Sequence, residues 1–191
     1  MMDIKKRYIR MIGEPVARYH EDPVRLLRAI RLSAKLNFNI ATDTEAPLAE
    51  LAPLLEHVPS SRLYEEVLKL FFKGHATATY EKLKHYGYMQ VLFPSSEQAL
   101  RQSNSDHNQR FIELAIHATD SRYNKGQSIN PGFLLAILLW PAVELQIEEE
   151  KKQHEHFFQQ IHAAIETVLR EQNNTLMIPK RLKSMMRSVW L

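Results

Sequence analysis

A helical repeat over residues 23–38 is the feature that most constrains the fold of this chain. Apolar side chains recur there at steps of three and four residues, at Leu27, Ile30, Ala34 and Phe38. Asp22 and Pro23 predict the helix start, because Asp can accept an orphan backbone N–H and Pro tolerates the first helical position. Only 5 of the 191 residues are glycine, which argues against a turn-rich β fold. The sequence therefore favours helices.

Similar patterns continue along the chain. Thr42-Asp43-Thr44-Glu45 fits a capping box, in which side chains satisfy the free N–H groups at a helix start. Pro141 is expected to break or kink the apolar helix that contains it. Residues 8–12 form a strand-like run with no visible partner. Further helices are predicted at residues 42–55, 62–73, 76–85, 111–123, 131–140 and 143–171, and from 179 onward. The predicted fold class is all-α with one short orphan strand at the N-terminus.

Composition narrows the class of protein. The chain has no cysteine, which fits a reducing cytoplasm, and no run of about 18 apolar residues that would predict a membrane span. Its net charge of +3 is segregated, with +5 over residues 1–38, −6 over 39–173 and +4 over 174–191. Two basic ends around an acidic middle are typical of a protein that binds a polyanion at defined places. The alternative is that both ends are solvated surface.

One cluster of charged residues suits nucleotide chemistry. Glu21, Arg25 and Arg28 follow one another at steps of four and three residues, so they fall on one side of a helix. A carboxylate can accept from a base amino group, and arginines can donate to base edges or phosphates. The histidines predict no metal site, since His154 and His156 lie on nearly opposite sides of a helix.

The same region resembles the neck of the bacterial tRNA nucleotidyltransferase and poly(A) polymerase family. Members carry an arginine–isoleucine–glycine–x–proline run, then Glu-Asp-x-x-Arg, then a Leu-Arg-Ala-hydrophobic-Arg helix. Here the three motifs read Arg10-Met11-Ile12-Gly13-Glu14-Pro15, Glu21-Asp22-Pro23-Val24-Arg25 and Leu27-Arg28-Ala29-Ile30-Arg31. Their shared order and spacing make the resemblance specific. It implies a multi-helix neck and body array.

The resemblance also implies roles for individual residues. Asp22 and Arg25, beside Glu21, would meet the base edge of the incoming nucleotide. For Arg28 and Arg10, contacts with the triphosphate or ribose and plain structural pairing are both open. Arg18 and Arg31 are interpreted as RNA-backbone or packing residues. Further expected RNA-binding residues are Lys35, Lys180, Arg181 and Lys183.

The second half of the chain indicates which branch of the family the sequence resembles, the poly(A) polymerases or the CCA-adding enzymes. Residues 130–134 and 178–182 resemble the part of bacterial poly(A) polymerases assigned to RNA and helicase binding, which favours that branch. The expected domains are residues 1–12, a remnant of the last strand of a catalytic head; 13–104, the neck and body with the nucleotide-selecting motif; and 105–191, the RNA- and helicase-binding region. Expected partners are RNA 3′ ends and a DEAD-box helicase, without DNA or membrane.

Catalysis is not expected from this chain alone. Nucleotidyl transfer uses clustered carboxylates that hold divalent ions on the triphosphate. In the family these come from a Gly-Ser pair and an Asp-x-Asp on the head, and the chain contains neither motif. The full-length enzyme would use ATP and Mg²⁺ to add AMP to RNA. The alternatives are a fragment of a CCA-adding enzyme and a helical protein-interaction module with no nucleic-acid role.

Overall fold

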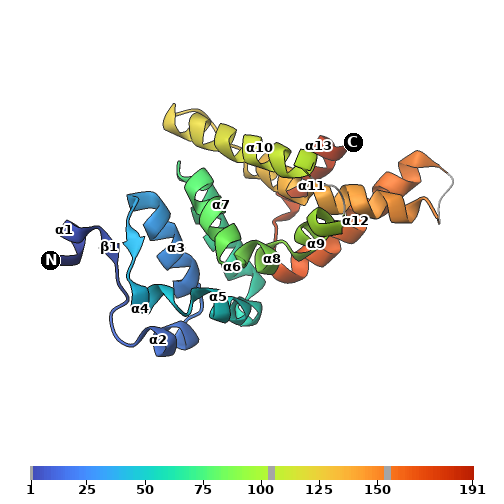
Figure 1. Ribbon diagram of the computed structural model, residues 1–191. Helices are drawn as coiled ribbons and strands as arrows, with labels where there is room; N and C mark the ends of the chain where they lie inside the picture. The colour runs from blue at the N-terminus through green and yellow to red at the C-terminus, as the bar shows by residue number, and fades with distance from the viewer. Residues whose placement is uncertain (1, 103–105, 153–155) are drawn as a thin grey trace.

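The computed structural model describes residues 2–102, 106–152 and 156–191 and consists almost entirely of helices (Figure 1). Its N-terminal part contains α1 (Met2–Lys6), β1 (Tyr8–Ile9), α2 (Pro15–Glu21), α3 (Val24–Leu36), β2 (Asn39–Ile40), α4 (Thr42–Glu45), α5 (Leu48–Leu51) and the 3₁₀ helix η1 (Ala52–His57). The remainder contains α6 (Ser60–Phe71), α7 (Ala76–His85), α8 (Tyr88–Leu92), α9 (Pro94–Gln102), α10 (Asp106–Asn124), α11 (Pro131–Glu150), α12 (Phe157–Thr175) and α13 (Lys180–Trp190). The predicted all-α class is confirmed.

The N-terminal strand has a partner within the chain. β1 pairs in parallel with β2, so that Tyr8 lies opposite Asn39 and Ile9 opposite Ile40. The Asn39 N–H donates to the Arg7 carbonyl at 2.9 Å. The prediction that this strand is an orphan is therefore wrong. The chain turns back after α3 and supplies the backbone groups that the strand requires.

The start of α3 also differs from its prediction. Asp22 ends α2 instead of capping α3, and Pro23 occupies the N-cap of α3 without a side-chain hydrogen bond. The Asp22 carboxylate binds Arg62 instead. A cap that the sequence pattern did not suggest lies at Glu14, whose carboxylate accepts from Val16 and Ala17 N–H groups at the start of α2.

Residues 42–57 form three short helices where one was predicted. The capping box is wrong, because Ala41 is the N-cap of α4 and provides no side-chain hydrogen bond. Asp43 instead accepts from Arg10, and the Thr44 hydroxyl accepts from the Met11 N–H. Pro47 and Pro53 lack the N–H that a continuous helix needs, which explains the division.

Helix α11 is the central element of the second half. It continues through Pro141, so the predicted break there is wrong, and the predicted helix 143–171 is divided between α11 and α12. By length and composition α11 could cross a membrane, but 56% of its most apolar window is buried against the protein. It packs against α9, α10, α12 and α13, which makes it the core helix of this half.

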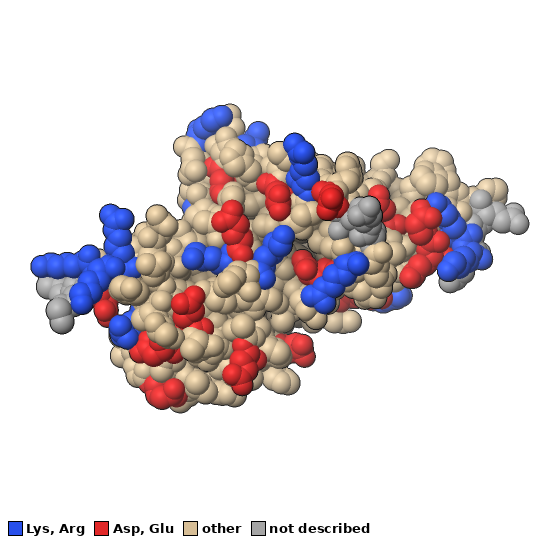
Figure 2. Space-filling view, in the orientation of Figure 1, with Lys and Arg blue, Asp and Glu red and all other residues tan. Residues whose placement is uncertain are grey.

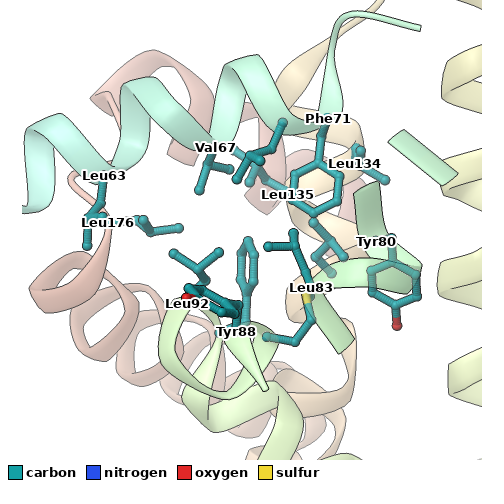
Figure 3. Packing of buried hydrophobic residues seen from close by; sticks show 14 of the residues in the cluster. Leu63, Val67, Phe71, Tyr80, Leu83, Tyr88, Leu92, Leu134, Leu135 and Leu176 are labelled. Carbon is teal, nitrogen blue, oxygen red and sulfur yellow. The ribbon is translucent and has the colours of Figure 1, made fainter. Parts of the chain in front are cut away.

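The hydrophobic core is continuous from α3 to α13. Figure 3 shows Phe71 of α6 beside Leu135 of α11, above Leu83 of α7, and it shows Leu176, which follows α12, beside Leu63 of α6. These residues come from both sides of the expected boundary at 104/105. Burial of this shared apolar surface holds the N-terminal and C-terminal helices against each other.

Candidate functional site

A single carboxylate joins two arginines where α2 meets α3. Glu21 Oε2 accepts from Arg18 Nη1 at 2.6 Å and from Arg25 Nη1 at 2.9 Å. The same Arg25 nitrogen also donates to the Arg18 carbonyl at 2.8 Å, and the Arg25 side chain is only 25% exposed. The hydrogen bond from Arg25, helped by the Arg18 charge, lowers the pKa of Glu21. This arrangement fixes the Arg25 guanidinium.

Asp22 is paired with an arginine that the sequence did not connect to it. Arg62 Nη2 lies 2.9 Å from Asp22 Oδ1 and 3.0 Å from Oδ2. Asp22 is 19% exposed, whereas Arg62 is 44% exposed and lies in the first turn of α6. No local pattern could have found Arg62, because the two residues are 40 positions apart. The Arg25 N–H donates to the Asp22 carbonyl at 3.0 Å, but the side chains of these two predicted partners are held by different groups.

Arg28 belongs to a second ion-pair group between α3 and α6. Its Nη2 lies 3.7 Å from Glu66 Oε1, which also accepts from Lys69 Nζ at 2.8 Å. Glu66 is 3% exposed, and its Oε2 has no hydrogen-bond partner. Sequence reasoning missed Glu66; its place on the apolar side of α6, one residue before Val67, is the signal that could have found it.

Arg10 lies apart from these groups. Its guanidinium contacts Asp3 Oδ2 at 3.2 Å and Asp43 Oδ2 at 2.9 Å, which connects the N-terminal segment to α4. The charges of Asp43 and Asp3 raise the pKa of Arg10. Arg10 thus forms structural ion pairs, and its contact with the triphosphate or ribose stays a prediction.

Arg31 and Lys35 lie toward the C-terminal end of α3, near His75 at the start of α7. His75 Nδ1 lies 2.9 Å from the Lys73 carbonyl, while His75 Nε2 and Arg31 Nε are buried without a hydrogen-bond partner. Burial lowers the pKa of His75, and the charges of Lys35 and Arg31 lower it further, against the opposite effect of Asp120.

This pKa shift predicts a pH dependence of folding. Because the neutral imidazole is favoured in the native state, the unfolded chain binds more protons below about pH 6.5. The free energy of unfolding is expected to fall as the pH drops from 6.5 through the lower native pKa of His75. His75→Asn should flatten this part of the urea-unfolding profile, with His20→Asn, at an exposed position, as the control. Identical pH profiles for His75→Asn and the parent would contradict the expectation.

The three C-terminal residues predicted to bind RNA lie on α13. Lys180 and Arg181 are exposed, and Lys183 Nζ donates to Asn173 Oδ1 at 2.6 Å. Burial raises the pKa of Tyr64, and the nearby charge of Arg181 partly opposes this rise. The start of α13 therefore lies beside α6. On the face of the molecule drawn in Figure 2, Lys and Arg are spread among Asp and Glu.

Among the described residues, no group of three or more His, Asp or Glu side chains could hold a metal ion. His154, named in the sequence-based argument about metal, lies outside the described residues. The residues of this chain that the structure describes therefore offer no fit for the Mg²⁺ that the family resemblance implies.

Two protein-family models match the chain. One, described as "Probable RNA and SrmB- binding site of polymerase A", matches residues 37–100. The other, described as "Polymerase A arginine-rich C-terminus", matches residues 153–191. Of the predicted RNA-binding residues, Lys180, Arg181 and Lys183 fall within the second match, whereas Arg18, Arg31 and Lys35 precede the first.

Curated relatives match along the whole chain. Poly(A) polymerase I of Salmonella typhimurium strain LT2 is 37% identical over 191 residues, which cover 100% of this chain and 41% of the relative. Poly(A) polymerase I of Escherichia coli O157:H7 is 38% identical with the same coverage. A CCA-adding enzyme of Levilactobacillus brevis is 41% identical over 70 residues, covering 37% of this chain and 18% of the relative.

Among solved structures, "Structure of tRNA-processing enzyme with CTP" aligns with 17% identity and a TM-score of 0.46, covering 99% of this chain and 67% of that chain. The chain spans about 41% of the length of the poly(A) polymerases above. Both family models name polymerase A, and the similarity to poly(A) polymerases extends over the full 191 residues. The chain belongs to the bacterial poly(A) polymerase family.

Proposed function

We propose that this chain is the nucleotide-selecting and RNA-binding part of a polynucleotide adenylyltransferase, which adds AMP from ATP to RNA 3′ ends in the cytoplasm. The observation that carries this proposal is the chain-long similarity to poly(A) polymerases. The CCA-adding alternative is less favoured, because its match covers only 37% of the chain. The interaction-module alternative leaves the fixed arginine pair at Glu21 without a role.

The geometry supports base selection by Asp22 and Arg25. A carboxylate accepts hydrogen bonds and a guanidinium donates them, so the two together present a donor–acceptor pattern to a base edge. Arg25 Nη1 is occupied by Glu21 and the Arg18 carbonyl, which leaves the other guanidinium nitrogens to donate. Arg62 positions the Asp22 carboxylate. Because both side chains are held before the nucleotide arrives, little ordering entropy would be lost on binding.

Metal chemistry is not proposed for this chain. Mg²⁺ would polarise the triphosphate when bound, but the described residues provide no carboxylate cluster for it. In this proposal the chain contributes binding and orientation of the base and the RNA. A DEAD-box helicase is a further proposed partner. The family model whose description names SrmB matches residues 37–100, so the candidate contact proposed here is that region and not the expected region 105–191.

RNA binding is expected to be weak, salt-dependent and largely insensitive to sequence. Lys and Arg that neutralise RNA phosphates release counterions, so affinity falls as salt rises, with a slope of about −0.7 per phosphate contact for single strands. The measurement is fluorescence anisotropy of labelled single-stranded RNA between about 50 and 200 mM salt. Lys35→Ala should make the slope shallower by about 0.7. Absence of binding at low salt, or binding that salt does not change, would contradict the proposed RNA role.

A further inference from the structure

Two adjoining cavities form one groove between α10, α11 and α13. Their volumes are about 470 and 430 Å³, each within the range of ordinary ligand sites, about 300–1,000 Å³. Phe133 and Val189 line both cavities, which places the two side by side. Phe133 is 53% exposed and Val189 is 42% exposed, which makes this groove an open apolar surface.

Aromatic rings dominate one end of the groove. Phe111 of α10, Phe133 and Trp140 of α11, and Trp190 of α13 line it together with His107. The Trp190 indole is held in place, because its Nε1 donates to the Ala136 carbonyl at 3.1 Å. Several flat rings from three helices therefore converge on one solvent-accessible space, which is the kind of surface on which nucleic-acid bases stack.

The charge of the groove complements an anion. The described residues that line it include no Asp or Glu, and they include Arg122, whose Nε and Nη2 donate to the Ser128 carbonyl at 3.0 and 2.9 Å. The α13 wall is formed by Met185 and Val189, and Arg181 precedes Met185 by four residues on the same helix face. Residues 174–191 carry four Lys and Arg and no acid. Arg122 is thus a cation of the lining, and Arg181 lies one helical turn from Met185 along α13.

We infer that this groove, which we call the aromatic groove, binds single-stranded RNA by stacking bases on Phe111, Phe133, Trp140 and Trp190, while Arg122 and Arg181 contact phosphates. The inference rests on the proposed RNA-binding function and names a surface for it. Most of the groove lies outside the two regions matched by family models, since only its α13 wall falls within residues 153–191. An acidic peptide would match the cations, but it would not need four converging rings.

The tryptophans provide a direct test. The chain contains 2 tryptophans, Trp140 and Trp190, and both line the aromatic groove. A base stacked against an indole quenches its fluorescence. Titration of the 191-residue chain with oligo(A) is therefore expected to quench tryptophan emission, with the same midpoint as the anisotropy of labelled oligo(A).

A matched pair of variants tests the rings. Phe133→Ala should weaken oligo(A) binding about tenfold, the loss of one base–aromatic stack, whereas Phe133→Trp should restore it. Phe158→Ala is the control, because that ring is 72% exposed on α12 and lies outside the aromatic groove. Thermal unfolding of each variant checks that the fold is retained.

The outcomes are distinguishable. Oligo(A) binding without quenching, and unchanged by Phe133→Ala, would overturn the aromatic groove as an RNA site but leave the proposed function standing. If Phe133→Ala instead abolished self-association in sedimentation without changing RNA affinity, the surface would be an interface between copies and the inference would be wrong. Absence of RNA binding at low salt would contradict the proposed function as well.

Discussion

Arg25→Ala, introduced into the intact polymerase, is expected to lower the preference for ATP over CTP by about tenfold to a hundredfold, with only a small change in RNA affinity. The physical reason is that one donor–acceptor partner of a base edge is removed, which costs about 1–3 kcal/mol of discrimination in side-chain readout of bases. RNA affinity is shared among many cations and should change little. The measurement compares ATP and CTP incorporation, and RNA binding, in variant and parent.

Two further variants sharpen the Arg25 test. Arg25→Lys keeps the charge but loses the planar guanidinium, whose Nη1 contacts both Glu21 and the Arg18 carbonyl and whose other nitrogens would donate to the base, so it should resemble Arg25→Ala in nucleotide choice. Lys35→Ala removes an exposed cation of the same helix and serves as the control. An unchanged ATP:CTP ratio with collapsed RNA binding would make Arg25 a phosphate-binding residue instead of a base selector.

Tyr88→Ala is expected to lower the free energy of unfolding by about 3–5 kcal/mol. Tyr88 is 0% exposed, and its ring packs in the core between α7, α8 and α11 (Figure 3). Its hydroxyl donates to the Leu48 carbonyl at 2.7 Å, which connects the core to α5. The substitution removes the ring, leaves a cavity and leaves a buried carbonyl unpaired. Urea unfolding followed by circular dichroism measures the change.

Tyr88→Phe separates the two contributions. It keeps the ring and removes only the hydroxyl, so it should cost about 1–3 kcal/mol for the unpaired Leu48 carbonyl. Phe158→Ala removes a ring that is 72% exposed and should change stability by about 0.5 kcal/mol or less. Equal stabilities for Tyr88→Ala and Phe158→Ala would show that the packing around Tyr88 contributes nothing to the core.

The sequence correctly predicted those helices whose ends are set by a nearby glycine or proline. The predicted helix at residues 76–85 is confirmed as α7, Ala76–His85. It begins shortly after Gly74 and ends just before Gly87, and both glycines have positive φ, at 79°. The helix predicted to start at Pro179 is confirmed as α13, Lys180–Trp190. Its start also depends on local chemistry, because the proline ring restricts the backbone just before the helix.

The predicted helix caps were wrong where a polar side chain binds a partner distant in the sequence instead of a nearby backbone N–H. Asp22 was expected to cap a helix, but it pairs with Arg62 of α6, and Glu45 accepts from the Tyr86 hydroxyl instead of completing a capping box. A local sequence pattern cannot tell which of the two interactions forms, because the distant partner comes within reach only when the chain folds. Pro141 is a case in which tertiary packing overrides a local preference of the backbone. Helix α11 is buried on several sides and continues through this proline.

The sequence by itself determined the helical class and the presence of the Glu21, Asp22 and Arg25 motif, because helix periodicity and residue type are properties of neighbours along the chain. Only the tertiary structure decided that Arg62 holds Asp22, where β1 finds its partner, and how the rings of three helices converge in the aromatic groove. Each of these depends on contacts between residues 20 to 80 positions apart, whose pairing is set by how the apolar faces of the helices pack into one core.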